Sequence, residues 1–215
     1  MKPNHHVEEA ELAAYAAGTL REGLEVLVAC HLTFCPACRD TVARLETAAA
    51  ALWLEQDGPA MPVASTVSLE QLLAAAAQPL APSAPKVPVA ADERLPAPLR
   101  NRVGPYQGLH FRRYPLDVGH RPLPELGEGA FLLDLPPELA LPGHVHEGVE
   151  RALVLSGGFA SDGQAYGPGD VSNETGEGVH EVLVDPGERC LCLFVNDGPI
   201  LPEQGWLRPF ARLLQ

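Results

Sequence analysis

The chain has 215 residues and a formal net charge of −13, from 28 acidic and 15 basic side chains. No segment is basic, because residues 1–57 carry −5, residues 58–100 are neutral and residues 101–215 carry −8. This balance disfavours nucleic-acid binding, since Lys and Arg contacts to phosphates supply most of that affinity. The chain has neither an apolar run of membrane-spanning length nor a signal peptide, so we expect a cytoplasmic protein.

The first 31 residues are predicted to form two helices. Residues 7–17 combine strong helix formers with a following glycine that ends the helix. Thr19, with Glu22 three residues later, predicts a capping box that opens the second helix. This helix delivers His31 to the corner where the next one begins.

Two further helices are predicted before the chain changes character. The third extends from about residue 36 to 55, and its helical periodicity predicts a buried side made of Val42, Leu45, Ala49, Leu52 and Trp53. Ser68 and Gln71 form another capping box over a fourth helix at residues 69–77. The fourth helix is interpreted either as part of a partner-binding clamp or as a further helix of the bundle.

The corner between the second and third helices carries His31-x3-Cys35-x2-Cys38, which is metal-ligand spacing. Cys38 lies one helical turn after Cys35, so both sulfurs face one point, and His31 reaches it from the preceding helix. Two thiolates and an imidazole favour zinc. We take His6 as the fourth ligand, with His5 as the alternative. A closed shell of four protein ligands predicts a structural rather than a catalytic zinc.

The remainder of the chain is predicted to be a proline-rich linker followed by a β domain. Six of the residues from 79 to 98 are proline, a density that disfavours helix and central strand. Beyond residue 100, short apolar runs separated by Gly, Pro and Asp predict strands of a sandwich or barrel, at residues 131–135, 151–155, 179–184 and 190–195. The sequence thus predicts an α + β chain of two domains: a small zinc-stabilised helical bundle (1–78), a linker (79–100) and an all-β domain (101–215).

A second set of potential metal ligands lies in the β domain. His144 and His146 are two residues apart, so in a strand they share a face, and Glu150 follows after a turn. A tight turn at residues 167–170 leads to another strand, and His180 stands on the one after it. Three imidazoles and a carboxylate can bind Zn²⁺, Fe²⁺, Mn²⁺ or Ni²⁺.

This pattern resembles the cupin family, whose fold is a double-stranded β-helix, or jelly roll. The order His144-x-His146-x3-Glu150-x6-Gly157 is similar to the first cupin motif. The turn at 167–170 followed by His180 is similar to the second motif. The sequence departs from the motifs in two places: Gly143 directly precedes His144, with Leu139 where the first glycine is expected, and the second motif reads Gly-Pro-Gly-Asp. Neither departure touches a ligand position.

Cys190 and Cys192 are two apart in a predicted strand and therefore share a face. Core packing is the commoner role of such cysteines. If that face lines the barrel near the metal, the two become candidate redox-sensitive thiols, to the extent that the metal or exposure favours thiolate. The odd total of five cysteines fits a reducing compartment better than a disulfide framework.

The two halves together, a His/Cys₂ helical unit joined by a proline-rich linker to a metal cupin, resemble the ChrR-type anti-sigma factors of bacteria. The resemblance implies that residues 1–78 bind an extracytoplasmic-function (ECF) sigma factor in a 1:1 complex and that the protein is not an enzyme. It also implies two zincs per chain, although the cupin site could hold another divalent metal. The implied ligands are His6, His31, Cys35 and Cys38 at the first site, and His144, His146, Glu150 and His180 at the second.

In that family the cupin domain is needed to release the sigma factor when singlet oxygen or organic peroxide appears. Release by dissociation and release by proteolysis are both compatible with the sequence. The main alternative function is a metal-dependent cupin dioxygenase or isomerase with a helical accessory domain. A zinc-finger DNA binder is a third possibility, which the missing basic patch disfavours.

Overall fold

The computed structural model describes residues 2–55, 94–146, 148–175, 180–198 and 200–202. The α-helices in this part of the chain are α1 (Glu9–Ala16), α2 (Glu22–Phe34), α3 (Pro36–Glu55) and α5 (Ala97–Val103). Short 3₁₀ helices η1 (Tyr106–Gly108), η2 (Pro115–Asp117) and η3 (Pro124–Leu126) follow. None of the described helices combines the length and the apolar character needed to cross a membrane.

The β domain is built from two antiparallel sheets. Its strands are β1 (Arg112–Tyr114), β2 (Val118–Pro122), β3 (Ala130–Leu135), β4 (Ala140–His146), β5 (Val149–Ser156), β6 (Phe159–Ser161), β7 (Gln164–Tyr166), β8 (Val171–Thr175), β9 (His180–Val184), β10 (Cys190–Asn196) and β11 (Ile200–Pro202). One sheet has the order β1-β2-β3-β10-β5-β8 and the other β11-β4-β9-β6-β7. β3, β5, β9 and β10 coincide with the four predicted strands. The all-β jelly roll predicted for this half is therefore confirmed.

The central strands of the six-stranded sheet are buried on both faces. Every residue of β3 and of β10 is buried. Phe131, Leu133 and Phe194 face the five-stranded sheet, whereas Leu132 and Leu193 pack on the other side with residues of the helices. A strand that is covered on both faces has no polar side to display, which explains why its sequence is an uninterrupted apolar run.

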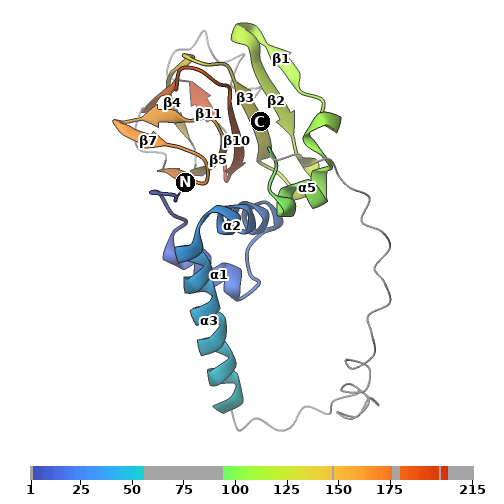
Figure 1. Ribbon diagram of the computed structural model, residues 1–215, viewed down its shortest axis with the longest axis vertical. Coiled ribbons are helices and arrows are strands. Elements are labelled where there is room, and N and C mark those ends of the chain that lie inside the picture. The colour runs from blue at the N-terminus through green and yellow to red at the C-terminus, as the bar shows by residue number, and fades with distance from the viewer. Residues whose placement is uncertain (1, 56–93, 147, 176–179, 199, 203–215) are drawn as a thin grey trace.

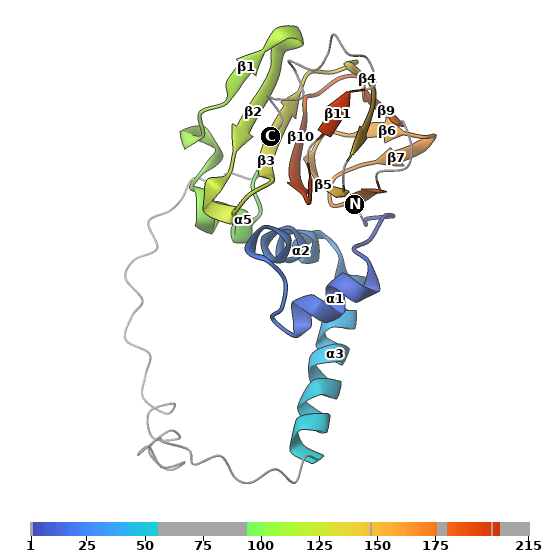
Figure 2. The same cartoon turned by 180° about the vertical axis from the view of Figure 1, so that it is seen from behind.

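The helices cover the outer face of the six-stranded sheet. Leu27 and Val28 of α2 belong to the same core as Leu132 and Leu193 of the sheet. Gly23 permits the close approach, because a Cβ there would lie 3.1 Å from the Leu126 carbonyl oxygen and 3.3 Å from a Val195 methyl group. Figure 1 and Figure 2 show α2 lying between the β domain and the pair α1 and α3. The helical unit, which the sequence predicted as a small zinc-stabilised bundle, therefore shares a core with the β domain.

α3 has the predicted bounds but not the predicted burial. Val42 is buried and Leu45 half-buried, whereas Ala49 is exposed and Leu52 is 64% exposed. Beyond its first turns the helix extends away from the rest of the molecule (Figure 1). Helical periodicity identified a potential apolar face, but no other described part of the chain covers its distal half. The Trp53 side chain and the predicted helix at 69–77 lie outside the described residues.

Two local predictions are wrong for identifiable reasons. α2 starts at Glu22 with Arg21 as its N-cap, and the Thr19 hydroxyl donates back to the Ala14 carbonyl oxygen at 3.2 Å instead of capping α2. Residues 97–100, assigned to the linker, begin α5. Its prolines stand at the N-terminus, where a missing N–H removes no intrahelical hydrogen bond.

Candidate metal centre

The His31–Cys38 stretch forms the predicted corner between α2 and α3. Cys35 is the residue between the two helices, and its backbone N–H donates to the His31 carbonyl oxygen at 2.9 Å. Pro36 is the first residue of α3, and Cys38 follows within its first turn. The Cys38 N–H points at the Cys35 sulfur across 3.5 Å. Local helix geometry alone therefore brings both sulfurs and the His31 ring to one point.

The segment before α1, residues 2–8, is called the N-terminal arm, and its His6 supplies the fourth potential metal ligand. The ligand atoms of His6, His31, Cys35 and Cys38 all lie within 4.8 Å of one another. His6 Nδ1 is 3.3 Å from the Cys35 sulfur and 3.5 Å from the Cys38 sulfur, and His31 Nε2 is 3.3 Å from the Cys38 sulfur. Tetrahedral zinc with its usual bond lengths separates neighbouring ligand atoms by roughly 3.3 to 3.8 Å. This donor set can hold a metal ion of that size.

His6, and not His5, faces the cluster. The His5 ring packs on Tyr166 with 4.4 Å between ring centroids, and its Nε2 lies 3.1 Å from the Ala165 carbonyl oxygen. The His5 carbonyl oxygen accepts the Val171 N–H at 3.2 Å. His5 thus fixes the arm to the β domain, and the next residue turns its ring toward the two cysteines.

Without a metal ion, burial favours the neutral forms of the side chains in this cluster. His31 and Cys35 are fully buried and Cys38 nearly so, whereas the His6 side chain is exposed. Burial lowers the pKa of His31, which keeps its imidazole neutral. Burial and the neighbouring Cys35 thiol raise the pKa of Cys38 to about 12. A divalent cation fits this site because it stabilises thiolates and neutral imidazoles as its ligands.

Cys30 lies close in sequence to Cys35 and Cys38 but is not part of the metal site. It is fully buried in α2 and contacts the backbone of Leu99 in α5. Burial raises the pKa of its thiol to about 12. Cys30 is therefore a core residue at the junction of α2 and α5.

The residues predicted for the second metal site lie on adjoining strands. β4 and β9 pair antiparallel with His144 opposite His180, and His146 of β4 is opposite Ile200 of β11. The side chains of these three histidines lie outside the described part of the structure. Glu150, at the start of β5, comes after the sharp turn at Gly148, where φ is +96°.

Glu150 is a carboxyl group buried inside the β domain. Its side chain is 4% exposed, and Oε2 accepts a 3.0 Å hydrogen bond from the Asn196 amide. Burial raises the pKa of Glu150 to about 8, against the lowering effect of the Asn196 hydrogen bond. A bound cation would stabilise the ionised form here, so Glu150 fits the ligand role predicted for it.

Cys190 and Cys192 share a face of β10, as predicted, and that face lies in the core between the two sheets. Their sulfurs are 3.5 Å apart and both residues are fully buried. The hydrogen bond with Cys190 and burial raise the pKa of the Cys192 thiol well above its usual range. Neither exposure nor a lowered pKa favours the reactive thiolate at this pair.

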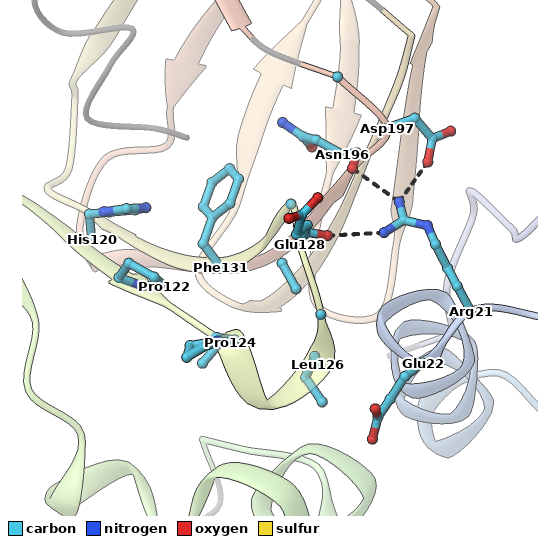
Figure 3. A pocket seen from close by; sticks show the side chains of 15 residues that line it. Arg21, Glu22, His120, Pro122, Pro124, Leu126, Glu128, Phe131, Asn196 and Asp197 are labelled. Carbon is cyan, nitrogen blue, oxygen red and sulfur yellow. Dashed lines mark hydrogen bonds and ion pairs between the residues drawn. The ribbon is translucent and has the colours of Figure 1, made fainter.

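Charged residues that the sequence did not single out join the helical unit to the β domain. Arg21 forms the wall of a cleft of about 1140 Å³, where it bonds the Asn196 carbonyl oxygen at 3.0 Å and the Asp197 carboxylate at 2.6 Å (Figure 3). Arg151 of β5 pairs with the same Asp197 at 3.0 Å and with Glu11 of α1. These bonds that Arg21 and Glu11 make to the β domain span 140 to 176 residues of sequence, so residue spacing carries no sign of them.

The cupin turn also contacts the metal cluster, which no sequence signal indicated. His31 Nδ1 lies 2.7 Å from the Gly169 carbonyl oxygen, and Asp170 accepts backbone N–H groups of the N-terminal arm. The motif Gly-Pro-Gly-Asp predicted a turn, and the turn is present with Gly169 at φ +92°. The contact of this turn with the N-terminal site depends on how the helical unit packs against the β domain, which the local sequence does not indicate.

Comparison with known proteins gives matches along the whole chain. A family model described as the ChrR cupin-like domain matches residues 103–201. The anti-sigma-E factor ChrR of Cereibacter sphaeroides is 35% identical over 220 aligned residues, which cover 99% of this chain and 100% of that protein. A chain in the crystal structure of Rhodobacter sphaeroides SigE in complex with the anti-sigma ChrR is 33% identical, with a TM-score of 0.71, over 92% of this chain and 100% of that one.

These full-length relatives bear the name of an anti-sigma factor, a regulator, and not that of an enzyme. The alternative of a cupin dioxygenase or isomerase is therefore overturned. The identity extends through the helical residues as well as the cupin-like domain. The chain belongs to the ChrR family of anti-sigma factors.

Proposed function

We propose that this protein sequesters an ECF sigma factor in a 1:1 complex and releases it under oxidative stress. The observation that carries the proposal is the likeness, over 92% of this chain, to a ChrR chain solved in complex with SigE. The partner places the protein in the cytoplasm, where a sigma factor meets RNA polymerase. The acidic N-terminal segment suits a basic surface on that partner.

The helical unit offers the binding surface. α3 presents an exposed Leu52 and Ala49 on its distal half, which no other described residue covers. An apolar helix face bordered by charged residues is suited to packing against another helix. Leu52 is then an anchor for the sigma factor, which explains why the predicted buried position is exposed in the isolated chain.

The first metal site has a structural role in this proposal. Zinc held by His6, His31, Cys35 and Cys38 fixes the angle between α2 and α3, and so fixes the direction in which α3 extends. Four protein ligands fill the tetrahedral shell and leave no position for a substrate. Zinc at this site supplies rigidity and not catalysis.

The second site is assigned to sensing. His144, His146, Glu150 and His180 would bind a second zinc or another divalent metal within the jelly roll. We favour this metal over the thiols as the target of singlet oxygen or organic peroxide, because Cys190 and Cys192 are fully buried and the pKa of Cys192 is raised. Oxidation of those thiols would require the β domain to open first.

Co-expression with the sigma factor encoded nearest to it tests the proposal. The wild-type chain should purify with the sigma factor and with two zincs per chain. The double variant Cys35→Ala/Cys38→Ala should lose one zinc and most sigma binding, whereas Cys30→Ala, a buried cysteine outside the cluster, should keep both. Retention of wild-type sigma affinity by the double variant would refute the structural role of this metal.

The sensing role needs its own variant. His144→Ala/Glu150→Ala should still bind the sigma factor, because α3 and the first site are untouched, but should fail to release it when singlet oxygen is generated. Cys190→Ser/Cys192→Ser should still respond. Normal release by the metal-site variant would move sensing away from the second metal.

A further inference from the structure

The turn Gly167–Asp170, which precedes β8, contacts both segments that bring histidines to the N-terminal metal cluster: α2, which carries His31, and the N-terminal arm, which carries His6. His31 donates from Nδ1 to the Gly169 carbonyl oxygen at 2.7 Å, while its other ring nitrogen, Nε2, faces the Cys38 sulfur at 3.3 Å. The His31 side chain is fully buried, so no water competes for that hydrogen bond. A backbone carbonyl accepts but never donates, so it fixes the tautomer that leaves Nε2 free for a metal.

Asp170 of the same turn holds the arm that carries His6. Its Oδ1 accepts the backbone N–H of Asn4 at 2.6 Å and of His5 at 2.8 Å, and its Oδ2 accepts the N–H of Gly167 at 2.8 Å. The carboxylate is 4% exposed. Charge-assisted hydrogen bonds at such distances are about twice as strong as neutral ones. Asp170 therefore positions the residue directly after His5.

The packing at Gly169 leaves no room for a side chain. Its φ is +92°, and a Cβ there would lie 2.5 Å from Cβ of Phe34 and 2.9 Å from the Pro3 ring. Phe34 ends α2, and Pro3 begins the arm. The turn is thus wedged between the two segments that bring the histidines to the cluster.

The same turn is bonded to the strand that lines the interior of the jelly roll. Gly169 N–H donates to the Val154 carbonyl oxygen at 2.8 Å, and Val154 N–H donates to the Asp170 carbonyl oxygen at 3.0 Å. Val154 is fully buried and pairs with Cys192 of β10. One residue of β5 therefore separates the interior of the jelly roll from the N-terminal cluster.

We propose that the turn Gly167–Asp170 of the β domain is the outer shell of the N-terminal metal site, with Gly169 positioning His31 and Asp170 positioning His6. The inference rests on the proposed metal binding by these histidines and extends it. Metal retention by the helical unit then depends on its docking to the β domain. By thermodynamic reciprocity, loss of the metal weakens that docking by the same factor.

The test measures metal affinity in the full-length chain. Cobalt(II) is the probe, because its thiolate charge-transfer absorption reports the two-cysteine site and is silent for the His₃Glu site. Gly169→Ala and Asp170→Ala should lower cobalt affinity by about 10- to 100-fold, the usual effect of removing an outer-shell partner. Gly187→Ala is the matched control: its φ is +107° and a Cβ there meets nothing within 4 Å, so affinity should stay within about twofold of wild type.

A spectroscopic readout separates positioning from a general loss of structure. In zinc-loaded wild type, ¹⁵N NMR of the His31 ring should show a slowly exchanging Nδ1–H and a metal-bound Nε2. In Gly169→Ala that proton should exchange rapidly, while the β-domain amide spectrum matches that of Gly187→Ala. Were the Asp170→Ala chain unfolded, Asp170→Asn would decide, because its neutral amide accepts more weakly and should still lower affinity by about threefold.

Loss of metal binding and loss of the outer-shell role give different results. A wild-type chain without the thiolate band would refute metal binding by the cluster itself. A wild-type chain with the band, together with unchanged affinity in Gly169→Ala and in the folded Asp170 variant, would overturn the outer-shell inference and leave the metal site intact.

Discussion

The two candidate metal centres are held together in different ways. In the N-terminal centre, three of four donors lie within the eight residues His31–Cys38, and helix geometry directs them to one point. In the cupin centre, the predicted ligands lie on β4 and β9, which pair in one sheet, and on β5 of the other sheet. The first centre is local in sequence and lies at a junction, whereas the second is distributed and lies in the β domain's own framework.

This difference predicts unequal dependence on metal. The β domain has two packed sheets with a buried interior, so its strands have hydrophobic support without an ion. At the helix corner around Cys35, four potential metal ligands occupy the place where apolar side chains would otherwise pack. Metal should therefore stabilise the corner much more than the sheets.

Chelation of the metal has the largest expected effect. Structural zinc contributes an apparent 10 to 16 kcal/mol, roughly, in small zinc peptides, and part of this should be lost at the α2–α3 corner. Amide hydrogen exchange should become at least about 100-fold faster for residues 31–38 and change by less than about tenfold in β3 and β10. Equal acceleration in the strands would contradict the difference between the two regions and would make them one cooperative unit toward metal loss.

Truncation of Leu27 tests how far the two regions share one core. Leu27 is fully buried in α2 and packs in the core that includes the outer face of the six-stranded sheet. Leu27→Ala should lower the free energy of unfolding by about 2 to 5 kcal/mol. Leu52→Ala, at a leucine that is 64% exposed in α3, should change it by less than about 0.5 kcal/mol.

The measurement for this pair is denaturant unfolding followed by both helix and aromatic signals. A shared core predicts that Leu27→Ala shifts a single transition in both signals. Two separate transitions, with only the helical one displaced, would mean that the halves fold independently in spite of their contact.

Part of the sequence interpretation was accurate because the signals were local. Cys35 and Cys38 are one turn apart, so their convergence with His31 follows from helix geometry. The apolar run at 190–195 predicted a strand, and the structure confirms it as β10. Apart from the Thr19 cap and the start of α5, the errors concern contacts between distant segments.

His6, Leu52 and Asp170 illustrate what the sequence could not supply. Selection of His6 over His5 depends on the contacts of His5 with Tyr166 and of Asp170 with the arm, some 165 residues away. Leu52 lies on a periodic apolar face, but periodicity cannot say whether a partner surface exists. The predicted burial there failed because the chain itself provides no described cover.

Acidification should destabilise the β region through His120. This imidazole is 3% exposed, contacts the Phe131 ring at 5.2 Å, and its Nε2 has no hydrogen-bond partner among the described residues. Burial, with a smaller effect of Arg112, lowers the pKa of His120 from 6.5 to about 4. The folded state therefore keeps His120 neutral where the unfolded chain binds a proton.

Because the unfolded chain binds a proton that the folded chain does not, the free energy of unfolding falls as the pH falls. Stability from His120 is complete above pH 6.5 and is lost as pH falls toward 4, by up to about 3 kcal/mol. His120→Phe should match wild type near pH 7 and lose less stability between pH 6.5 and 4, as measured by denaturant unfolding across that range. His110→Gln, at an exposed histidine, should follow the wild-type curve. Parallel curves for wild type and His120→Phe would exclude this group as the cause.

The smallest expected effect concerns the ion pairs between the two regions. Glu11 of α1 pairs with Arg151 of β5, and the two side chains are 11% and 13% exposed. Glu11→Gln should lower the free energy of unfolding by about 1 kcal/mol, because Arg151 keeps its second bond to Asp197. Glu125→Gln, which removes the partner of Arg121 at 38% exposure, should cost less than about 0.5 kcal/mol.

Salt separates the two cases further. The exposed Glu125 pair should be screened almost completely at 1 M NaCl, whereas the Glu11 pair, shielded between α1 and β5, should retain most of its effect. Equal costs for the two substitutions would show that the Glu11–Arg151 pair adds no stability beyond that of a surface contact. The docking of the helical unit would then depend on the apolar core around Leu27, the turn at Gly169 and the bonds of Arg21 to the β domain.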